Sequence, residues 1–153
     1  MTDLYSTPRD RRPVPSLQVA ASAGIAEAER TVVLALRLDA PETVLDTALR
    51  MARFEEAALR VVVFSSDSPA GPLDNDPAQI TELVDALSSA GVEFEVLRAE
   101  ADVASQVIDL AEGWTAELIV ISTRRRSAVM KLLLGSSVQR VILEASCPVV
   151  VVK

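Results

Sequence analysis

The chain has 153 residues, and its 22 acidic and 15 basic side chains give it a net charge of −7. Such an acidic chain is repelled by phosphate backbones, which argues against general nucleic-acid binding. The sequence contains no histidine, which excludes a Ser–His–Asp or Cys–His nucleophile and a zinc site built on histidine.

Hydrophobic residues make up 50% of the chain, and the mean hydropathy is +0.30. The densest apolar runs are far shorter than the roughly 20 residues of a membrane-spanning helix, so no membrane partner is expected. These runs are Val32–Leu36, Leu118–Ile121 and Val149–Val152, and they suit buried strands of a parallel sheet. The single cysteine, Cys147, indicates a reducing, cytoplasmic environment and is interpreted as a small buried hydrophobe rather than a reactive thiol.

Residues 1–30 differ in composition from the rest of the chain. Three prolines and three arginines fall within Ser6–Ser16, which predicts a flexible or loosely docked tail. A targeting segment is the alternative, because two of these arginines precede the mildly apolar stretch Leu17–Ala26. The prolines and the low hydrophobicity argue against that alternative.

A regular alternation of strands and helices begins after this tail. Thr31–Arg37 has the continuous apolar character of a buried strand, and Pro41 suits the first turn of the helix that follows. Ala58–Ser65 is expected to be the second strand. A polar stretch then leads to Pro77, which suits the start of a second helix, and Gly91 is positioned to end that helix.

The same alternation continues to the end of the chain. Val92–Arg98 is expected to be the third strand, and apolar residues at helical spacing in Val103–Ala111 predict the third helix. Leu118–Ser122 has the composition of a fourth strand. Gly135 and the two serines after it are expected to open a fourth helix, and Pro148–Lys153 is expected to be the fifth strand.

This order of elements predicts a single α/β domain over residues 31–153. Strands that alternate with helices form a parallel sheet covered on both faces, which gives a three-layer, doubly wound fold. Ligands of such folds bind beyond the carboxyl ends of the strands. In this chain those ends are Arg37–Asp39, Phe64–Ser66, Arg98–Ala99 and Ser122–Arg126.

The amino end of the expected fourth helix is a candidate anion site. Gly135, Ser136 and Ser137 offer backbone N–H groups and two hydroxyls there, and the helix dipole adds partial positive charge. The simpler interpretation is that one serine caps the helix. Neither G-x-x-x-x-G-K-[ST] nor G-x-G-x-x-G, the common phosphate-binding motifs, occurs in the sequence.

Three arginines cluster in Thr123–Ser127, and Arg37 and Arg98 are expected on the same rim of the sheet. Arginines this close together require compensating negative charge. A bound anion or an acidic partner is one source. The other source is the set of nearby carboxylates, namely Asp39, Glu100 and Asp102.

The segment Ala116–Lys153 combines an apolar strand, a glycine–serine pair and a final Cys-Pro followed by valines. This arrangement resembles the universal stress protein family, whose motif is glycine, two residues, glycine, nine residues and Gly-[Ser/Thr]. The spacing is intact here: Ser122 and Arg125 stand at the first two glycine positions, and Gly135–Ser136 is retained.

The resemblance implies a five-stranded sheet of order 3-2-1-4-5, similar to the adenine nucleotide alpha hydrolase-like fold. It also implies a homodimer formed by pairing of the last strand. The run Val149–Val152 suits that implication, because an exposed apolar edge strand needs a cover and a symmetric partner supplies one.

The candidate nucleotide site departs from the family pattern at three positions. Family members that bind ATP carry an acidic residue at the end of the first strand, where this chain has Arg37. Ser122 and Arg125 replace glycines that let the backbone approach ribose and phosphate. The resemblance, with these departures, predicts a stress-response regulatory dimer that is not a strong ATP binder and that binds a regulatory protein partner.

The alternative is an ATP- or AMP-binding stress protein in which Gly135, Ser136 and Arg125 hold the phosphate. No catalytic residue and no metal-ligand set is identified, which argues against an enzyme.

Overall fold

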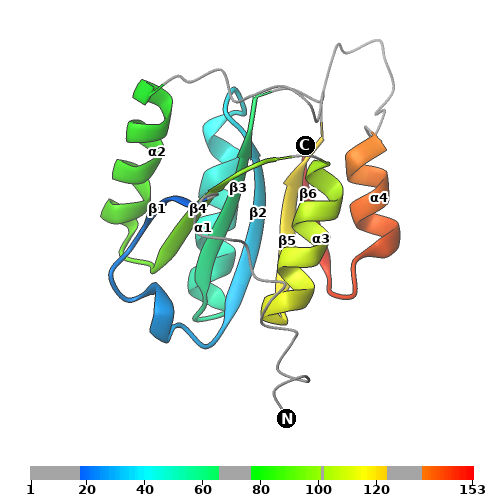
Figure 1. Ribbon diagram of the computed structural model, residues 1–153, viewed down its shortest axis with the longest axis horizontal. Helices are drawn as coiled ribbons and strands as arrows, with labels where there is room; N and C mark the ends of the chain where they lie inside the picture. Colours follow the sequence, from blue (N-terminus) through cyan, green and yellow to red (C-terminus); the bar gives the residue numbers. More distant parts are fainter. Residues whose placement is uncertain (1–17, 66–76, 101, 124–135) are drawn as a thin grey trace.

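The computed structural model describes residues 18–65, 77–100, 102–123 and 136–153 of the chain. In this part of the chain a single sheet lies between two layers of helices (Figure 1). The strands are β1 (Gln18–Ala21), β2 (Thr31–Arg37), β3 (Ala58–Phe64), β4 (Phe94–Arg98), β5 (Leu118–Ser122) and β6 (Val149–Val152). The helices are α1 (Glu42–Phe54), α2 (Pro77–Ala90), α3 (Val103–Trp114), α4 (Ser136–Glu144) and the short 3-10 helix η3 (Ile25–Glu27).

The strand order in the sheet is β1-β4-β3-β2-β5-β6. Strands β2 to β6 pair in parallel, and their order corresponds to the 3-2-1-4-5 arrangement expected for the five main strands. The α/β fold class is therefore confirmed. The expected count of five strands is wrong for the described residues, because β1 adds a sixth strand that runs antiparallel to β4.

The extra strand β1 lies within the segment 1–30 that was predicted to be a flexible tail. Its four residues, Gln-Val-Ala-Ala, include a single large apolar side chain and are mostly exposed. Such a strand is held by backbone pairing and not by a buried face, so it leaves no clear apolar pattern in the sequence. Residues 1–17 of the predicted tail lie outside the described part of the chain.

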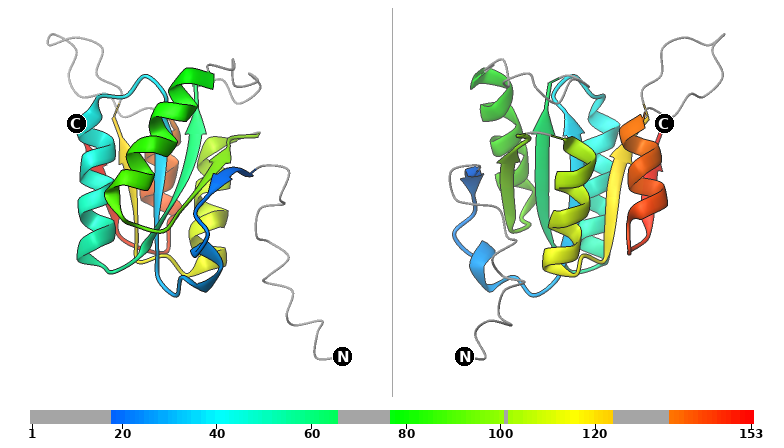
Figure 2. Two further views of the ribbon diagram at one scale, coloured as in Figure 1. Left: turned by 90° about the vertical axis from the view of Figure 1, so that its left-hand side faces the viewer. Right: turned by 45° about the vertical axis from the view of Figure 1, so that its right-hand side comes forward.

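Alternating side chains of the central strand β2 supply both halves of the core. Val32, Leu34 and Leu36 pack on the face covered by α1 and α2. Val33 and Ala35 pack on the opposite face, under α3 and α4. These five residues are at most 6% exposed, as expected for a parallel sheet covered on both faces. Figure 2 shows α3 and α4 side by side on their face of the sheet.

The helix boundaries follow the local signals in the sequence. Helix α1 begins directly after Pro41, and α2 begins at Pro77. Gly91 follows the end of α2 with a φ of 78°, a left-handed conformation that favours glycine. Asp102 caps α3 by accepting a hydrogen bond from the Ala104 amide at 3.2 Å. None of the helices in the described ranges has both the length and the apolar character needed to cross a bilayer.

Candidate functional site

The candidate site lies where β2 and β5 end side by side in the middle of the sheet. Ala35 of β2 pairs with Ile121 of β5, which places Arg37 and Ser122 at neighbouring strand ends. The chain leaves these two strands in opposite directions along the sheet, so their carboxyl ends form the topological switch point. Helix α4 begins on the same side of the molecule as the carboxyl ends of these strands (Figure 1).

The structure thus brings together part of the candidate site expected from the sequence. Arg37 and Ser122 share the rim, and Ser136 and Ser137 form the first turn of α4. Ser136 is exposed and Ser137 is half-buried. The other two candidate residues, Arg125 and Gly135, lie outside the described part of the chain.

Arg37 forms a two-point ion pair with Asp39 just beyond the end of β2. Its Nε donates to Oδ1 at 3.0 Å, and its Nη2 donates to Oδ2 at 3.2 Å. The side chain of Arg37 is 16% exposed, whereas that of Asp39 is 66% exposed. The amide of Leu38 donates to the Phe64 carbonyl at 3.0 Å, which fixes the backbone between the two charged residues. The expected compensation of Arg37 by a nearby carboxylate is therefore present.

The backbone at Ser122 is tied to the last strand. Ser122 pairs with Val152 of β6, and the next amide, that of Thr123, donates to the Val152 carbonyl at 2.9 Å. Thr123 is buried, and its hydroxyl lies 3.5 Å from the same carbonyl. The first position of the family motif is thus held by β6, while the residue before it, Ile121, pairs with Ala35 of β2.

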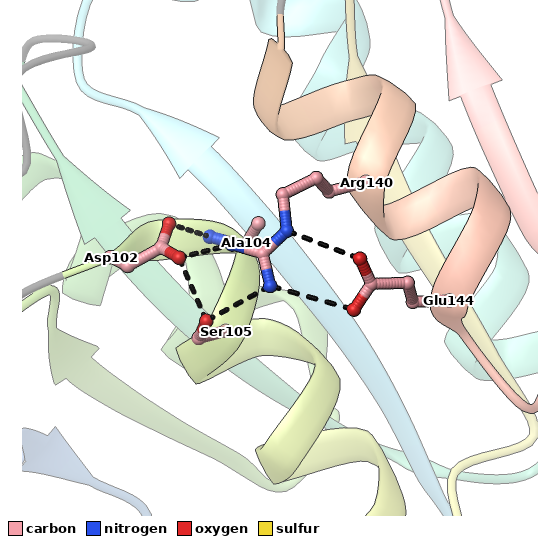
Figure 3. A network of polar contacts seen from close by, with 5 residues as sticks. All are labelled: Asp102, Ala104, Ser105, Arg140 and Glu144. Atoms are coloured by element: carbon pink, nitrogen blue, oxygen red, sulfur yellow. Dashed lines mark hydrogen bonds and ion pairs between the residues drawn. The ribbon is translucent and has the colours of Figure 1, made fainter.

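A second polar cluster joins the amino end of α3 to α4 (Figure 3). Asp102 accepts hydrogen bonds from the Ser105 hydroxyl at 2.7 Å and from the guanidinium of Arg140. Arg140 also donates to the Ser105 hydroxyl at 3.2 Å and to Glu144 Oε2 at 3.3 Å. We call these four residues the α3–α4 clamp.

The clamp perturbs the titration of its two central members. The Ser105 hydrogen bond, followed by the contacts of Arg140, holds the pKa of Asp102 below its usual value. Hydrogen bonds to Glu144 and Asp102 raise the pKa of Arg140. Both groups therefore stay charged at neutral pH. Through Arg140, the clamp ties α4 to the start of α3 one turn after Ser136 and Ser137.

Arg140 was not anticipated from the sequence. Asp102 was one of the carboxylates expected to compensate the arginines of Thr123–Ser127, which lie outside the described residues, and in the described part of the chain it pairs with Arg140 of α4. A local signal existed: Arg140 and Glu144 have the four-residue spacing of a helical ion pair. Only the packing of α3 against α4, however, brings Asp102 into this pair.

The described residues contain little reactive chemistry. Within the described ranges no group of three or more Cys, Asp or Glu side chains could hold a metal ion. Cys147 is half-buried and packs against the core under α3 and α4, and this burial raises the pKa of its thiol. A protonated thiol is a poor nucleophile, which agrees with its interpretation as a small hydrophobe.

Comparisons with known proteins identify relatives of this architecture. Residues 29–153 match the sequence model of the universal stress protein family. A universal stress protein of Methanocaldococcus jannaschii, MJ0531, is 40% identical over 63 residues, which cover 41% of this chain. The match covers 37% of that relative's own length.

Solved structures show the same fold over most of the chain. The universal stress protein from Archaeoglobus fulgidus is 28% identical, has a TM-score of 0.66, and is matched over 81% of this chain and 98% of its own. A structure of the universal stress protein from Archaeoglobus fulgidus in complex with dAMP is 26% identical, with a TM-score of 0.61 and coverage of 81% and 98%.

Proposed function

The chain belongs to the universal stress protein family, and we propose that it is a stress-response regulatory module that forms a homodimer and does not bind adenine nucleotides strongly. The observation that carries this proposal is the pair of Arg37 and Asp39 at the end of β2. A single cysteine, half-buried, suits a cytoplasmic setting. A regulatory protein is the partner that we propose for such a module.

The chemistry of Arg37 opposes adenine recognition. The exocyclic amino group of adenine is a hydrogen-bond donor, so an acceptor such as a carboxylate is its natural partner. A guanidinium has only donors, and Arg37 directs two of them at Asp39. The amino group of a base that entered here would meet the donors of Arg37 at the end of β2, where it needs an acceptor, and the nearby Asp39 carboxylate is already paired with Arg37.

Calorimetric titration with ATP, ADP and AMP, each with and without magnesium, tests this part of the proposal. We expect no saturable binding tighter than a Kd of about 100 μM, or roughly −5.5 kcal/mol. A Kd below about 10 μM for any of the three nucleotides would overturn it. A thermal shift of the protein in the same ligands gives an independent reading, since a ligand that binds the folded state raises Tm.

The homodimer is proposed to form through the outer edge of β6. The carbonyl of Pro148 accepts from the Ile119 amide of β5, and that of Val152 from the Thr123 amide just after β5, at 2.9 Å each. Because alternate residues of a strand bond to the same neighbour, Val149 and Val151 are expected to turn their backbone groups to the open side. All four valines of β6 are half-buried, so a partner strand would cover apolar side chains as well as backbone groups.

Nucleotide binding is the second candidate function. It is favoured by the dAMP complex of the 26% identical neighbour and by the two serines at the first turn of α4. In that case Gly135, Ser136 and Arg125 would hold the phosphate. If a nucleotide does bind, Gly135→Val should abolish its binding, because backbone N–H groups at a helix start need close approach of the ligand. Retained binding in that variant would place the ligand elsewhere.

A further inference from the structure

The strand β1 is an addition to the part of the chain that defines the family. The family match begins at residue 29, whereas β1 ends at Ala21. β1 pairs antiparallel with β4 at one edge of the sheet, and the chain then runs from there to β2 at the centre (Figures 1 and 2). Without β1, the edge of the sheet would be β4 itself.

The contacts that hold this segment on β4 are polar and specific. The Ser22 amide donates to the Phe94 carbonyl at 2.8 Å, and the Phe94 amide donates to the Ser22 hydroxyl at 2.8 Å. The same hydroxyl donates to Glu93 Oε1 at 2.7 Å, and the Gly24 amide donates to that oxygen at 3.0 Å. Gln18 donates to Glu95 Oε2 at 2.6 Å. The side chain of Glu95 in β4 thus contacts the start of β1, and that of Glu93, just before β4, contacts the residues after its end.

The Glu93 carboxylate lies in the space beside Gly24 that a side chain would occupy. A Cβ at this position would lie 2.7 Å from Glu93 Oε1, too close for an undisturbed contact. The absent side chain lets the Glu93 carboxylate reach the Gly24 amide. Gly24 thus adds one backbone contact to those that hold the segment after β1 on this edge.

Little apolar area reinforces these polar contacts. Three of the four β1 residues are exposed, Val19 is 37% exposed, and only Ala20 joins the core. The pairing is also interrupted by a register shift between Gln18 and Ala20. Hydrogen bonds between exposed groups contribute about 1 kcal/mol each or less, so β1 is bound far less firmly than the central strands.

From these contacts we infer that the β4 edge is a strand-accepting surface, filled within the chain by β1 and able to accept the same segment of a second copy. The second copy is the fitting occupant because it carries the same Gln18, Ser22 and Gly24 that β4 recognises. A tethered strand has a local concentration in the millimolar range, so the segment of the same chain normally wins. Release of β1 gives the protein a second pairing edge, opposite β6.

A double variant, Gln18→Ala with Ser22→Pro, tests the inference in the full-length chain. Proline removes the Ser22 amide and hydroxyl contacts, and alanine removes the contact to Glu95. The probe is a fluorescent peptide with the native sequence of residues 16–28, and its binding is followed by anisotropy. We expect the peptide to bind the variant at least tenfold more tightly than the wild type, whose own β1 competes for the edge.

Hydrogen exchange supplies the structural reading. The Phe94 amide should lose protection in the variant and regain it when the native peptide is added. A peptide with the same two substitutions serves as the matched control and should not bind. Equal or absent binding of the native peptide to the two proteins would refute the inference. So would a Phe94 amide that stays protected in the variant, or a variant that unfolds, because the inference requires the body to fold without β1.

Discussion

The guanidinium carbon of Arg60 lies 3.5 Å from the ring centroid of Trp114, within the core under α3. Arg60 is 1% exposed and is the largest fully buried side chain in the described residues. Its Nη1 donates to Glu95 at 2.6 Å, and its Nε donates to the Thr31 hydroxyl at 3.2 Å. A buried charge is thus compensated by a carboxylate, a hydroxyl and the face of an aromatic ring.

We predict that Arg60→Ala lowers the free energy of unfolding by about 3 kcal/mol or more. The substitution leaves the Glu95 carboxylate, which is 12% exposed, without its cation, and it opens a space beside Trp114. Urea unfolding followed by circular dichroism measures the loss. Arg60→Met combined with Glu95→Leu should lower the free energy of unfolding less than Arg60→Ala alone does. The double variant removes both charges and leaves side chains of similar volume in the core. A loss below about 1 kcal/mol in Arg60→Ala would contradict this account.

The α3–α4 clamp should make stability depend on pH at the acidic end of the range. The pKa of Asp102 in the folded state lies below its ordinary value of 3.8, so folding is favoured when Asp102 is ionised. This contribution is fully present above the unfolded pKa and disappears as the pH falls through the folded pKa. Because the side chain is 44% exposed, we expect less than about 1 kcal/mol.

Asp102→Asn tests this expectation, since asparagine still caps α3. The stability difference from the wild type should be present at pH 6 and should shrink below about pH 3.8. Asp109→Asn is the matched control, because Asp109 is an exposed residue of the same helix with no ion pair shown in the described structure. A wild-type advantage over Asp102→Asn that is unchanged from pH 6 to pH 3 would refute the prediction.

Restoring the family residue at the end of β2 should increase affinity for adenine nucleotides. Arg37→Asp replaces a donor with an acceptor and removes the cation that occupies Asp39. With Ser122→Gly and Arg125→Gly added, we expect the Kd for AMP to fall at least tenfold, or about 1.4 kcal/mol. Arg98→Asp, at the exposed end of β4, is the control for the change in charge. An equal effect of Arg98→Asp would indicate nonspecific electrostatics.

Proline on the outer side of β6 should break the homodimer. Val151→Pro removes an N–H that is expected to face the partner. It leaves the hydrogen bonds of the Pro148 and Val152 carbonyls to the Ile119 and Thr123 amides in place. Val151→Thr keeps this N–H and nearly the same volume, so it should remain dimeric. Light scattering at tens of micromolar protein distinguishes the two. A wild-type protein that is monomeric at this concentration would refute the dimer itself.

The sequence by itself determined the α/β class and most element boundaries, whereas the order of the five main strands came from the resemblance to a known family. Apolar runs such as Thr31–Arg37 mark strands buried on both faces, and Pro77 and Gly91 mark the ends of α2 through their own backbone restrictions. These signals are local, because each depends on the conformational preference or burial of a few consecutive residues. The family resemblance, through its implied strand order, likewise led us to expect Arg37 and Ser122 at the ends of neighbouring strands.

Only the tertiary structure decided the contacts between distant segments. β1 carries no strong apolar pattern, and it becomes a strand because β4 offers open backbone groups together with Glu93 and Glu95. Arg140 meets Asp102, and Arg60 meets Trp114, because packing of helices and sheet places them side by side. Such pairs depend on how whole helices and strands are placed relative to one another. The sequence around either residue of a pair does not reveal that placement.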